Sequence, residues 1–279
     1  MPPFAKGGGP GRGGGIFGMH LDKRLQAVAA LVPKGSRFAD IGTDHAYLPV
    51  WLVEQGVIPS AVAGDIATGP CQAARTTVAM HGAADKIAVR QGSGLAVLVP
   101  GEVDCIAICG MGGSTIISIL EADKATAQAA QRLVLQPMAG AAALRRYLVE
   151  QGWRLVAEDL VEDPPHFYEI ICAERAGKLV DVEATLASYS GAGDICASAK
   201  TVSTQINSAS YSEAEYLLGP ALLQAGHPLL EKQIARQKAS LEELLTNMAR
   251  SERAKASAKY VQTEQLLGEI QALQQKPEK

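Results

Sequence analysis

The sequence predicts an α/β protein with a doubly wound sheet of five parallel strands, an antiparallel hairpin at one edge and a C-terminal helical hairpin. Short apolar runs alternate with segments of helical periodicity over residues 37–151, which is typical of a parallel sheet covered by helices on both faces. Two further strand-like runs are joined by the short connection 163–166, which leaves too little chain for a parallel crossover. A helical pattern then returns from residue 217.

The expected elements follow one another in a regular order. A first helix begins at Leu21, because apolar residues recur on one helical face, and it ends at Pro33 and Gly35. Strands are expected at 37–43, 60–66, 87–92, 105–110, 132–137, 154–161 and 167–174. Helices are expected at 46–55, 68–82, 112–122 and 140–151, whereas 93–103 shows no clear pattern. Five parallel strands with an antiparallel edge hairpin form the Rossmann-like outline of class I methyltransferases, which is an analogy of fold alone.

Composition divides the chain into four parts. Residues 1–19 are rich in glycine and are expected to form a disordered tail, and residues 20–175 form the α/β domain. Residues 176–215 are rich in Ser, Ala, Thr and Gly, so we expect a flexible insert. Residues 216–279 carry apolar positions at alternating four- and three-residue steps, which predicts a coiled-coil-like helical appendage. This appendage could pack on the α/β domain, bind RNA or dimerise, so a monomer and a dimer both stay open.

The net charge of −3 is distributed unevenly along the chain. Lys and Arg outnumber Asp and Glu by 6 to 4 over 1–60 and by 9 to 7 over 229–279, so the two mildly basic ends could contact RNA phosphates. The sequence contains no apolar run of about eighteen residues and no secretory signal. The five cysteines are scattered, and Cys105 and Cys109 are better explained as core residues than as a metal pair. We therefore expect a cytoplasmic protein with no membrane span and no metal.

The first strand ends in the segment Asp40-Ile41-Gly42-Thr43-Asp44-His45. An acid at a strand end, then a glycine turn and a helix, is how a doubly wound sheet opens a ligand site. Gly42 would let the backbone approach the methionine part of S-adenosylmethionine, Asp40 would attract its ammonium group, and His45 is expected to contact the cofactor as well. A dinucleotide site needs G-x-G-x-x-G against a pyrophosphate, which the two acids here would repel. The residues favour S-adenosylmethionine, and the alternative is an ordinary strand–helix turn.

The other strand ends extend the predicted site. Asp65 ends the second strand, where a carboxylate can accept hydrogen bonds from both ribose hydroxyls; the alternative is a cap for the next helix, although Thr68 suits that role better. Three glycines in the segment 110–113 exceed what a turn needs and leave room for a flat substrate. Further cofactor contacts are expected from Ile66, Gly92, Ser93, Gly94, Cys109 and Gly110. Acceptor contacts are expected from Met111, Gly112, Gly113, Gln136 and Pro137.

The strings ADIGTDHAYLP, AGDIATGP, GMGG, LQP and FYEIICAE, in this order and spacing, resemble the bacterial tRNA (adenine-22-N1)-methyltransferase family. The resemblance runs from Leu21 to Glu174 and resumes at 217–230. It implies a class I methyltransferase domain, S-adenosylmethionine as the methyl donor, and N1 of an adenine in the tRNA D-arm, at position 22, as the acceptor. Departures from the family pattern stand at Ser93, Met138, 163–166 and 176–215. Where this chain has Ser93, the family has an Asp that contacts the cofactor adenine. Where it has Met138, the family has an Asn near the acceptor.

Methylation at N1 of adenine needs no prior deprotonation, because this nitrogen carries an in-plane lone pair. The site must orient the base and stabilise the positive charge that moves onto it. Asp44 is the candidate for accepting a hydrogen bond from the N6 amino group, and Tyr47 could stack on the base or hydrogen-bond to it; the alternative for Asp44 is an N-cap of the helix near Ala46. Phosphate contacts are expected from Lys23, Arg24, Arg145 and Arg146. Two rivals stay open: a methyltransferase-like module that binds S-adenosylmethionine or RNA without this activity, and a methyltransferase for another substrate.

Overall fold

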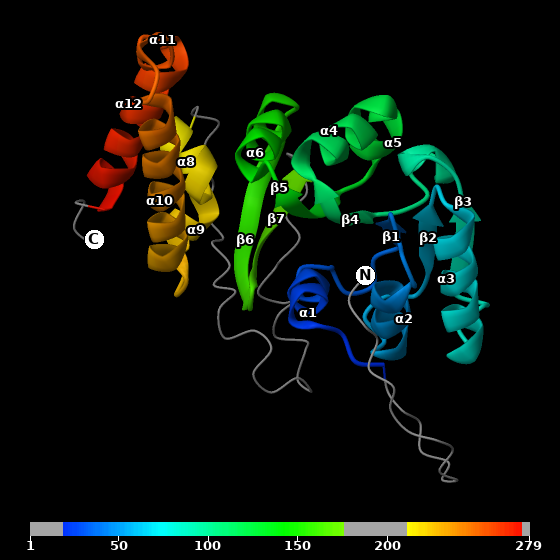
Figure 1. The fold of residues 1–279 in the computed structure, drawn as a ribbon. Helices are drawn as coiled ribbons and strands as arrows, with labels where there is room; N and C mark the ends of the chain where they lie inside the picture. Colours follow the sequence, from blue (N-terminus) through cyan, green and yellow to red (C-terminus); the bar gives the residue numbers. More distant parts are fainter. Residues whose placement is uncertain (1–18, 176–210, 275–279) are drawn as a thin grey trace.

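A seven-stranded sheet forms the centre of the protein (Figure 1). The structure is a computed structural model that describes residues 19–175 and 211–274. The strand order in the sheet is β3-β2-β1-β4-β5-β7-β6. The strands are β1 (Phe38–Ile41), β2 (Ala61–Asp65), β3 (Ile87–Gln91), β4 (Cys105–Gly112), β5 (Arg132–Ala139), β6 (Trp153–Asp163) and β7 (His166–Arg175).

The pairing of the strands confirms the predicted fold class. Strands β1 to β5 are parallel, and β7 runs antiparallel to both β5 and β6, so that β6 and β7 form the edge hairpin. Strands β4 and β5 run further than predicted, to Gly112 and Ala139. The extension passes through an irregular stretch, because Gly110 has a φ of 75° and the register shifts on either side of Met111.

Helices cover both faces of the sheet and enclose two apolar cores (Figure 1). On one face lie α1 (Lys23–Ala30), α2 (Tyr47–Glu54) and α3 (Thr68–Met80). On the other lie the 3-10 helix η1 (Gly94–Val97) and the helices α4 (Gly113–Ala122), α5 (Lys124–Ala129) and α6 (Ala141–Glu150). The sequence pattern did not predict η1 or α5, because neither is long enough to show a helical period; Asp123 caps α5 by accepting a hydrogen bond from the Thr126 N–H at 3.0 Å.

Five helices follow residue 211 in the part of the chain that is described. They are α8 (Glu213–Leu218), α9 (Pro220–Ala225), α10 (Leu230–Met248), α11 (Glu252–Lys255) and α12 (Ala258–Gln274). The Gln274 amide lies 3.4 Å from a Glu231 carboxylate oxygen, so the end of α12 lies beside the start of α10, as in the predicted antiparallel hairpin. The predicted tail 1–19, apart from its last residue, and most of the predicted insert 176–215 lie outside the described residues. Within those residues, no helix combines the length and apolarity that a membrane span requires.

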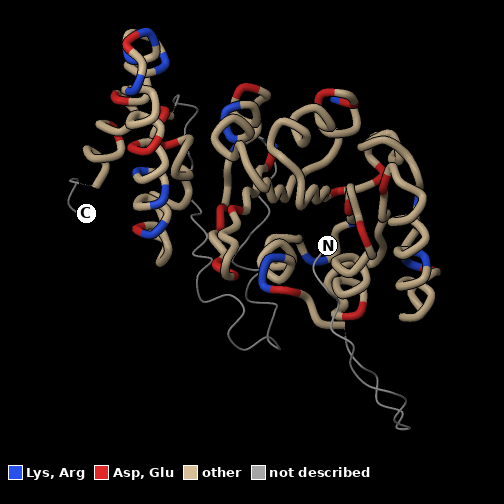
Figure 2. Tube along the Cα trace, viewed as in Figure 1, with Lys and Arg blue, Asp and Glu red and all other residues tan. Residues whose placement is uncertain are grey.

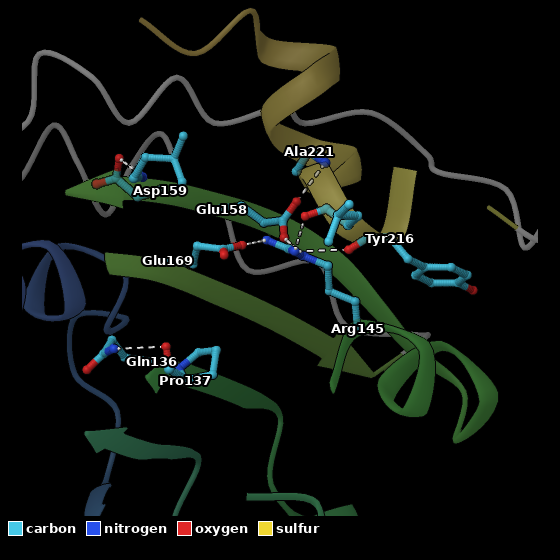
Figure 3. Close-up of polar contacts among 10 residues, drawn as sticks. Gln136, Pro137, Arg145, Glu158, Asp159, Glu169, Tyr216 and Ala221 are labelled. Atoms are coloured by element: carbon cyan, nitrogen blue, oxygen red, sulfur yellow. Dashed lines mark hydrogen bonds and ion pairs between the residues drawn. The ribbon is translucent and has the colours of Figure 1, made fainter. Parts of the chain in front are cut away.

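A buried ionic network joins the C-terminal helices to the sheet (Figure 3). The Arg145 guanidinium of α6 pairs with Glu158 of β6 at 2.5 Å and with Glu169 of β7 at 2.7 Å, and donates to the Tyr216 carbonyl of α8 at 3.0 Å. Glu158 also accepts a hydrogen bond from the Ala221 N–H of α9 at 2.9 Å. The prediction that Arg145 contacts tRNA phosphate is wrong, because its side chain is fully buried. It holds α8 and α9 against the sheet instead.

Candidate active site at the carboxyl edge of the sheet

The strand order reverses at β1, which has β2 on one side and β4 on the other. In a doubly wound sheet, ligands bind outside the carboxyl ends of the strands at such a switch point. Gly42 follows β1 with a φ of 80°, and Gly110 lies in β4 with a φ of 75°. Both conformations strongly favour glycine. The two glycine turns predicted from the sequence therefore stand together at one edge of the sheet.

The Gly42 turn is closely held by its neighbours. The N–H groups of Gly42 and Thr43 both donate to the Gly64 carbonyl, at 2.7 and 3.0 Å. A β-carbon on residue 42 would lie 2.0 Å from Met111 Cε, so the Met111 side chain rests directly on this glycine. Met111, predicted for the acceptor site, thus also borders the region predicted for the methionine part of the cofactor.

Asp40 is a buried acid at the end of β1, with 8% of its surface exposed. Burial raises its pKa to about 6, and the charge of Asp65 acts in the same direction. A hydrogen bond from Thr43 and the positive charge of Arg24 oppose this rise without cancelling it. The carboxylate form of Asp40 is therefore poorly compensated within the protein alone, and a cationic ligand beside it would stabilise that form.

Asp65 ends β2 and connects the second and third strand ends. Its Oδ1 accepts a hydrogen bond from the Ala67 N–H at 2.7 Å, and its carbonyl accepts one from the Gly92 N–H at 2.9 Å. Thr68, the preferred cap in the sequence analysis, instead accepts from the Gln91 amide at 3.0 Å. Asp65 thus organises the start of α3 through one oxygen, while no hydrogen bond within the described residues engages its Oδ2. The neighbouring residues predicted for cofactor contact are Ile66, which is 68% exposed, and Gly92, Ser93 and Gly94.

Asp44, His45 and Tyr47 form an exposed group above the Gly42 turn. The Asp44 side chain is 79% exposed and lies 3.4 Å from His45 Nε2. The His45 and Tyr47 rings stack, with centroids 5.0 Å apart and planes 9° from parallel. Thr43 Oγ1, and not Asp44, accepts the hydrogen bond from the Ala46 N–H, at 3.1 Å. The capping alternative for Asp44 is therefore absent from the structure, and the carboxylate faces solvent.

Gln136 anchors the glycine-rich segment 110–113, which forms the floor of the candidate site. This side chain is buried, and its Oε1 accepts from Arg24 at 3.0 Å and from the Gly110 N–H at 3.1 Å. Its amide nitrogen donates to the Pro137 carbonyl at 3.1 Å (Figure 3). Gln136 and Pro137 were predicted to touch the acceptor, but both are buried in the structure. The Gln136 oxygen binds both the Gly110 N–H and the Arg24 guanidinium.

The other predicted site residues at the end of β4 have different structural environments. A β-carbon on Gly113 would lie 2.6 Å from the Gly140 carbonyl oxygen, so this glycine is required by the packing of α4 against the next loop. Gly112 is the N-cap of α4. Burial raises the pKa of the Cys109 thiol, which keeps it protonated. Among residues 19–175 and 211–274, no group of three or more His, Cys, Asp or Glu side chains is placed to bind a metal.

The predicted phosphate-contact residues other than Arg145 lie at two places. Lys23 and Arg24 begin α1, beside the β6–β7 hairpin (Figure 2). Lys23 is exposed, whereas Arg24 keeps 22% of its side chain exposed and points toward Gln136. Arg146 on α6 is partly exposed, pairs with Glu213 and lies 4.8 Å from the Tyr216 ring centre. The Arg146 guanidinium is thus already engaged in contacts with two residues of α8.

One feature next to the site could not be predicted from the sequence. The Arg24 guanidinium lies 5.8 Å from the centre of the Tyr168 ring, and that ring stacks with His166 at 5.7 Å. Tyr168 belongs to the quoted FYEIICAE string, but no local pattern indicates a partner 144 residues earlier in the chain.

A family model described as a methyltransferase domain matches residues 21–171, which agrees with the sheet order and the site at its carboxyl edge. The fold and site thus define a protein of the methyltransferase-domain class. The tRNA (adenine(22)-N(1))-methyltransferase of Bacillus subtilis is 42% identical over 160 residues, which cover 57% of this chain and 67% of that protein. The chain belongs to the tRNA (adenine(22)-N(1))-methyltransferase family, as the sequence resemblance predicted.

Solved structures extend the similarity to the C-terminal helices. The structure of the Bacillus subtilis M1A22 tRNA methyltransferase is 31% identical, with a TM-score of 0.71, and the match covers 92% of this chain and 98% of that one. A Streptococcus pneumoniae protein, described as a candidate tRNA (m1A22) methyltransferase and solved with S-adenosyl-L-methionine, is 30% identical, with a TM-score of 0.71, 91% of this chain covered and 99% of that one. A Streptococcus agalactiae protein assigned to the NADB-Rossmann superfamily is 29% identical, with a TM-score of 0.74, 93% of this chain covered and 99% of that one.

Proposed function

We propose that this methyltransferase transfers a methyl group from S-adenosylmethionine to N1 of adenine 22 in tRNA. The observation that carries the proposal is the pairing of a buried acid, Asp40, with an exposed acid, Asp44, on either side of Gly42 at the switch point of the sheet. One acid suits a cationic cofactor and the other suits an acceptor base. The named tRNA methyltransferase relatives supply the acceptor and its position.

The residues at the strand ends fit the cofactor. Asp40 is a desolvated carboxyl group with a raised pKa, and an ammonium group beside it would stabilise its carboxylate form. The Asp65 carboxylate stands at the second strand end, where it can accept ribose hydroxyls. Gly42 adopts a φ of 80° at the turn after β1, and the Met111 side chain packs against it. When bound, S-adenosylmethionine supplies the activated methyl group, and these residues bind and orient it.

The exposed group above the turn is placed to serve the acceptor. Asp44 would accept a hydrogen bond from the N6 amino group of adenine, which becomes more acidic as N1 is alkylated, so the interaction strengthens in the transition state. Tyr47, 45% exposed and stacked with His45, would support one face of the base. The target adenine is stacked or paired in folded tRNA, so it must be flipped out to reach these residues.

Gln136 and Arg24 would act without touching the reacting atoms. Their hydrogen bonds fix Gly110 at 3.1 Å from the Gln136 oxygen and keep the floor of the acceptor region in one conformation. Such positioning lowers the entropy that must be lost when the base enters. A tRNA substrate also implies that the protein works in the cytoplasm.

The experiment is an acceptor test with isotopically labelled S-adenosylmethionine. Unmodified tRNA transcripts with adenine at position 22 are incubated with the enzyme and digested, and the nucleosides are separated by mass spectrometry. The proposal predicts labelled 1-methyladenosine. Cofactor binding without any methyl transfer would favour the binding-module alternative, and label in another nucleoside would assign another substrate.

A further inference from the structure

A column of planar side chains leads from the tip of the β6–β7 hairpin to the floor of the candidate active site. His166 and Tyr168 lie two residues apart on β7, so both point to the same face of the strand. Their rings stack at 5.7 Å, and the Arg24 guanidinium continues the column 5.8 Å from the Tyr168 centre. Arg24 then donates to Gln136, which binds the Gly110 N–H.

The column is open to solvent at its outer end. His166 is exposed and Tyr168 is only partly buried, whereas Ile170, the next residue on the same face, belongs fully to the core. The opposite face of the hairpin is already covered, because Arg236 of α10 lies 4.4 Å from the Phe167 ring centre and Lys232 pairs with Glu162. The hairpin tip is thus held from behind by α10 and presents aromatic surface on the side of α1.

The surroundings of this surface suit RNA. Exposed Lys23 stands at the start of α1, next to Arg24. Asp22, the acid next to Lys23, pairs with Arg24 at 3.6 Å, so it repels an incoming phosphate less. Aromatic rings beside basic side chains form the usual platform on which unpaired bases stack. A flipped adenine leaves its neighbours unstacked, and these would need such a platform.

We propose that His166 and Tyr168 form a stacking platform for a nucleotide adjacent to the target adenine, with Arg24 linking the platform to the acceptor floor. This inference rests on the proposed tRNA substrate. It also makes Arg24 a positioning residue and leaves the phosphate contact to Lys23.

The test compares Tyr168→Phe with Tyr168→Leu. Affinity for an unmodified tRNA transcript is measured by fluorescence anisotropy at several salt concentrations, together with affinity for S-adenosylhomocysteine and the melting temperature. The Phe variant keeps the ring and should bind tRNA as the wild type does. The Leu variant should bind about tenfold more weakly, the scale expected for losing one base–aromatic stack. Its salt dependence should stay unchanged, whereas Lys23→Ala should lower the slope by about 1.

Controls separate stacking from folding. Phe167→Leu removes a ring from the opposite face of the same hairpin, where it lies against Arg236, and should leave tRNA affinity unchanged. His166→Ala alters an exposed ring and should weaken tRNA binding without shifting the melting temperature. The proposed stacking platform is contradicted if Tyr168→Leu binds tRNA as the wild type does, or if Tyr168→Phe loses as much tRNA affinity as Tyr168→Leu. If the wild-type protein neither binds nor methylates tRNA, the proposed function falls as well, which distinguishes the two failures.

Discussion

Replacing the buried acid of the candidate cofactor site should make the protein more stable and less able to bind its cofactor. Asp40 is 8% exposed, and burial raises its pKa to about 6 from the ordinary value of 3.8. The folded protein therefore bears an energetic cost for ionising this group at neutral pH. Asp40→Asn keeps the shape of the side chain and its ability to accept from Thr43, but it removes the charge.

The magnitude follows from the linkage between ionisation and folding. Each pKa unit corresponds to about 1.4 kcal/mol, so the difference between about 6 folded and 3.8 unfolded amounts to about 3 kcal/mol. The new amide hydrogens also need partners, so we expect a net gain of about 1 to 3 kcal/mol in the free energy of unfolding at pH 8. Binding of S-adenosylhomocysteine should weaken about tenfold or more, because a charge-assisted hydrogen bond is lost.

The pH dependence gives the sign of the effect. Because the folded pKa is raised, the stability contribution of wild-type Asp40 is fully present below about pH 4 and is lost as the pH rises through about 6. Urea unfolding at pH 4, 6 and 8 should therefore show a variant advantage that grows with pH. Asp85→Asn, at an exposed acid, is the control and should shift stability by less than about 0.5 kcal/mol. An Asp40→Asn protein that is less stable than wild type at pH 8, or that retains full cofactor affinity, would refute the reasoning.

Three further changes test other parts of the account. Asp65→Ala should weaken cofactor binding by about 1.5–3 kcal/mol, measured by calorimetry, through loss of hydrogen bonds to a charged acceptor; unchanged affinity would remove Asp65 from the site. Asp44→Asn should leave cofactor affinity and melting temperature near wild type while single-turnover methyl transfer falls by orders of magnitude; near-normal transfer would leave Tyr47 as the candidate. Arg145→Met should lower the free energy of unfolding by about 3–5 kcal/mol because it leaves the buried Glu158 and the partly buried Glu169 without their cation, whereas Arg146→Met should cost less than about 1 kcal/mol; equal effects would contradict the buried network.

The sheet and its glycine turns could be predicted because their signals are local. Alternating apolar runs and helical periods report the strands and helices directly, and Asp40, Gly42 and Asp65 stand at strand ends that the sequence itself locates. The topology then brings those ends to one edge of the sheet. This is why the predicted cofactor residues lie together in the structure.

The side chains that hold distant segments together could not be predicted in the same way. Arg145 and Arg146 are adjacent on α6 and look alike in the sequence, yet only the first is fully buried, because glutamates from two strands and the carbonyl of a later helix converge on it. Gln136 reads as a polar residue at a strand end, but contacts with Gly110 and Arg24 turn it inward. Such roles depend on residues far away in the chain.

The most direct test of the central claim is methyl transfer to a matched pair of tRNA transcripts. One transcript carries adenine at position 22 and the other carries guanine there, with the base pairing of the D-arm otherwise preserved. We expect incorporation of one labelled methyl group per adenine-22 transcript, a reverse-transcription stop at that position, and no incorporation into the guanine-22 transcript. Equal incorporation into both transcripts, or none into either, would contradict it.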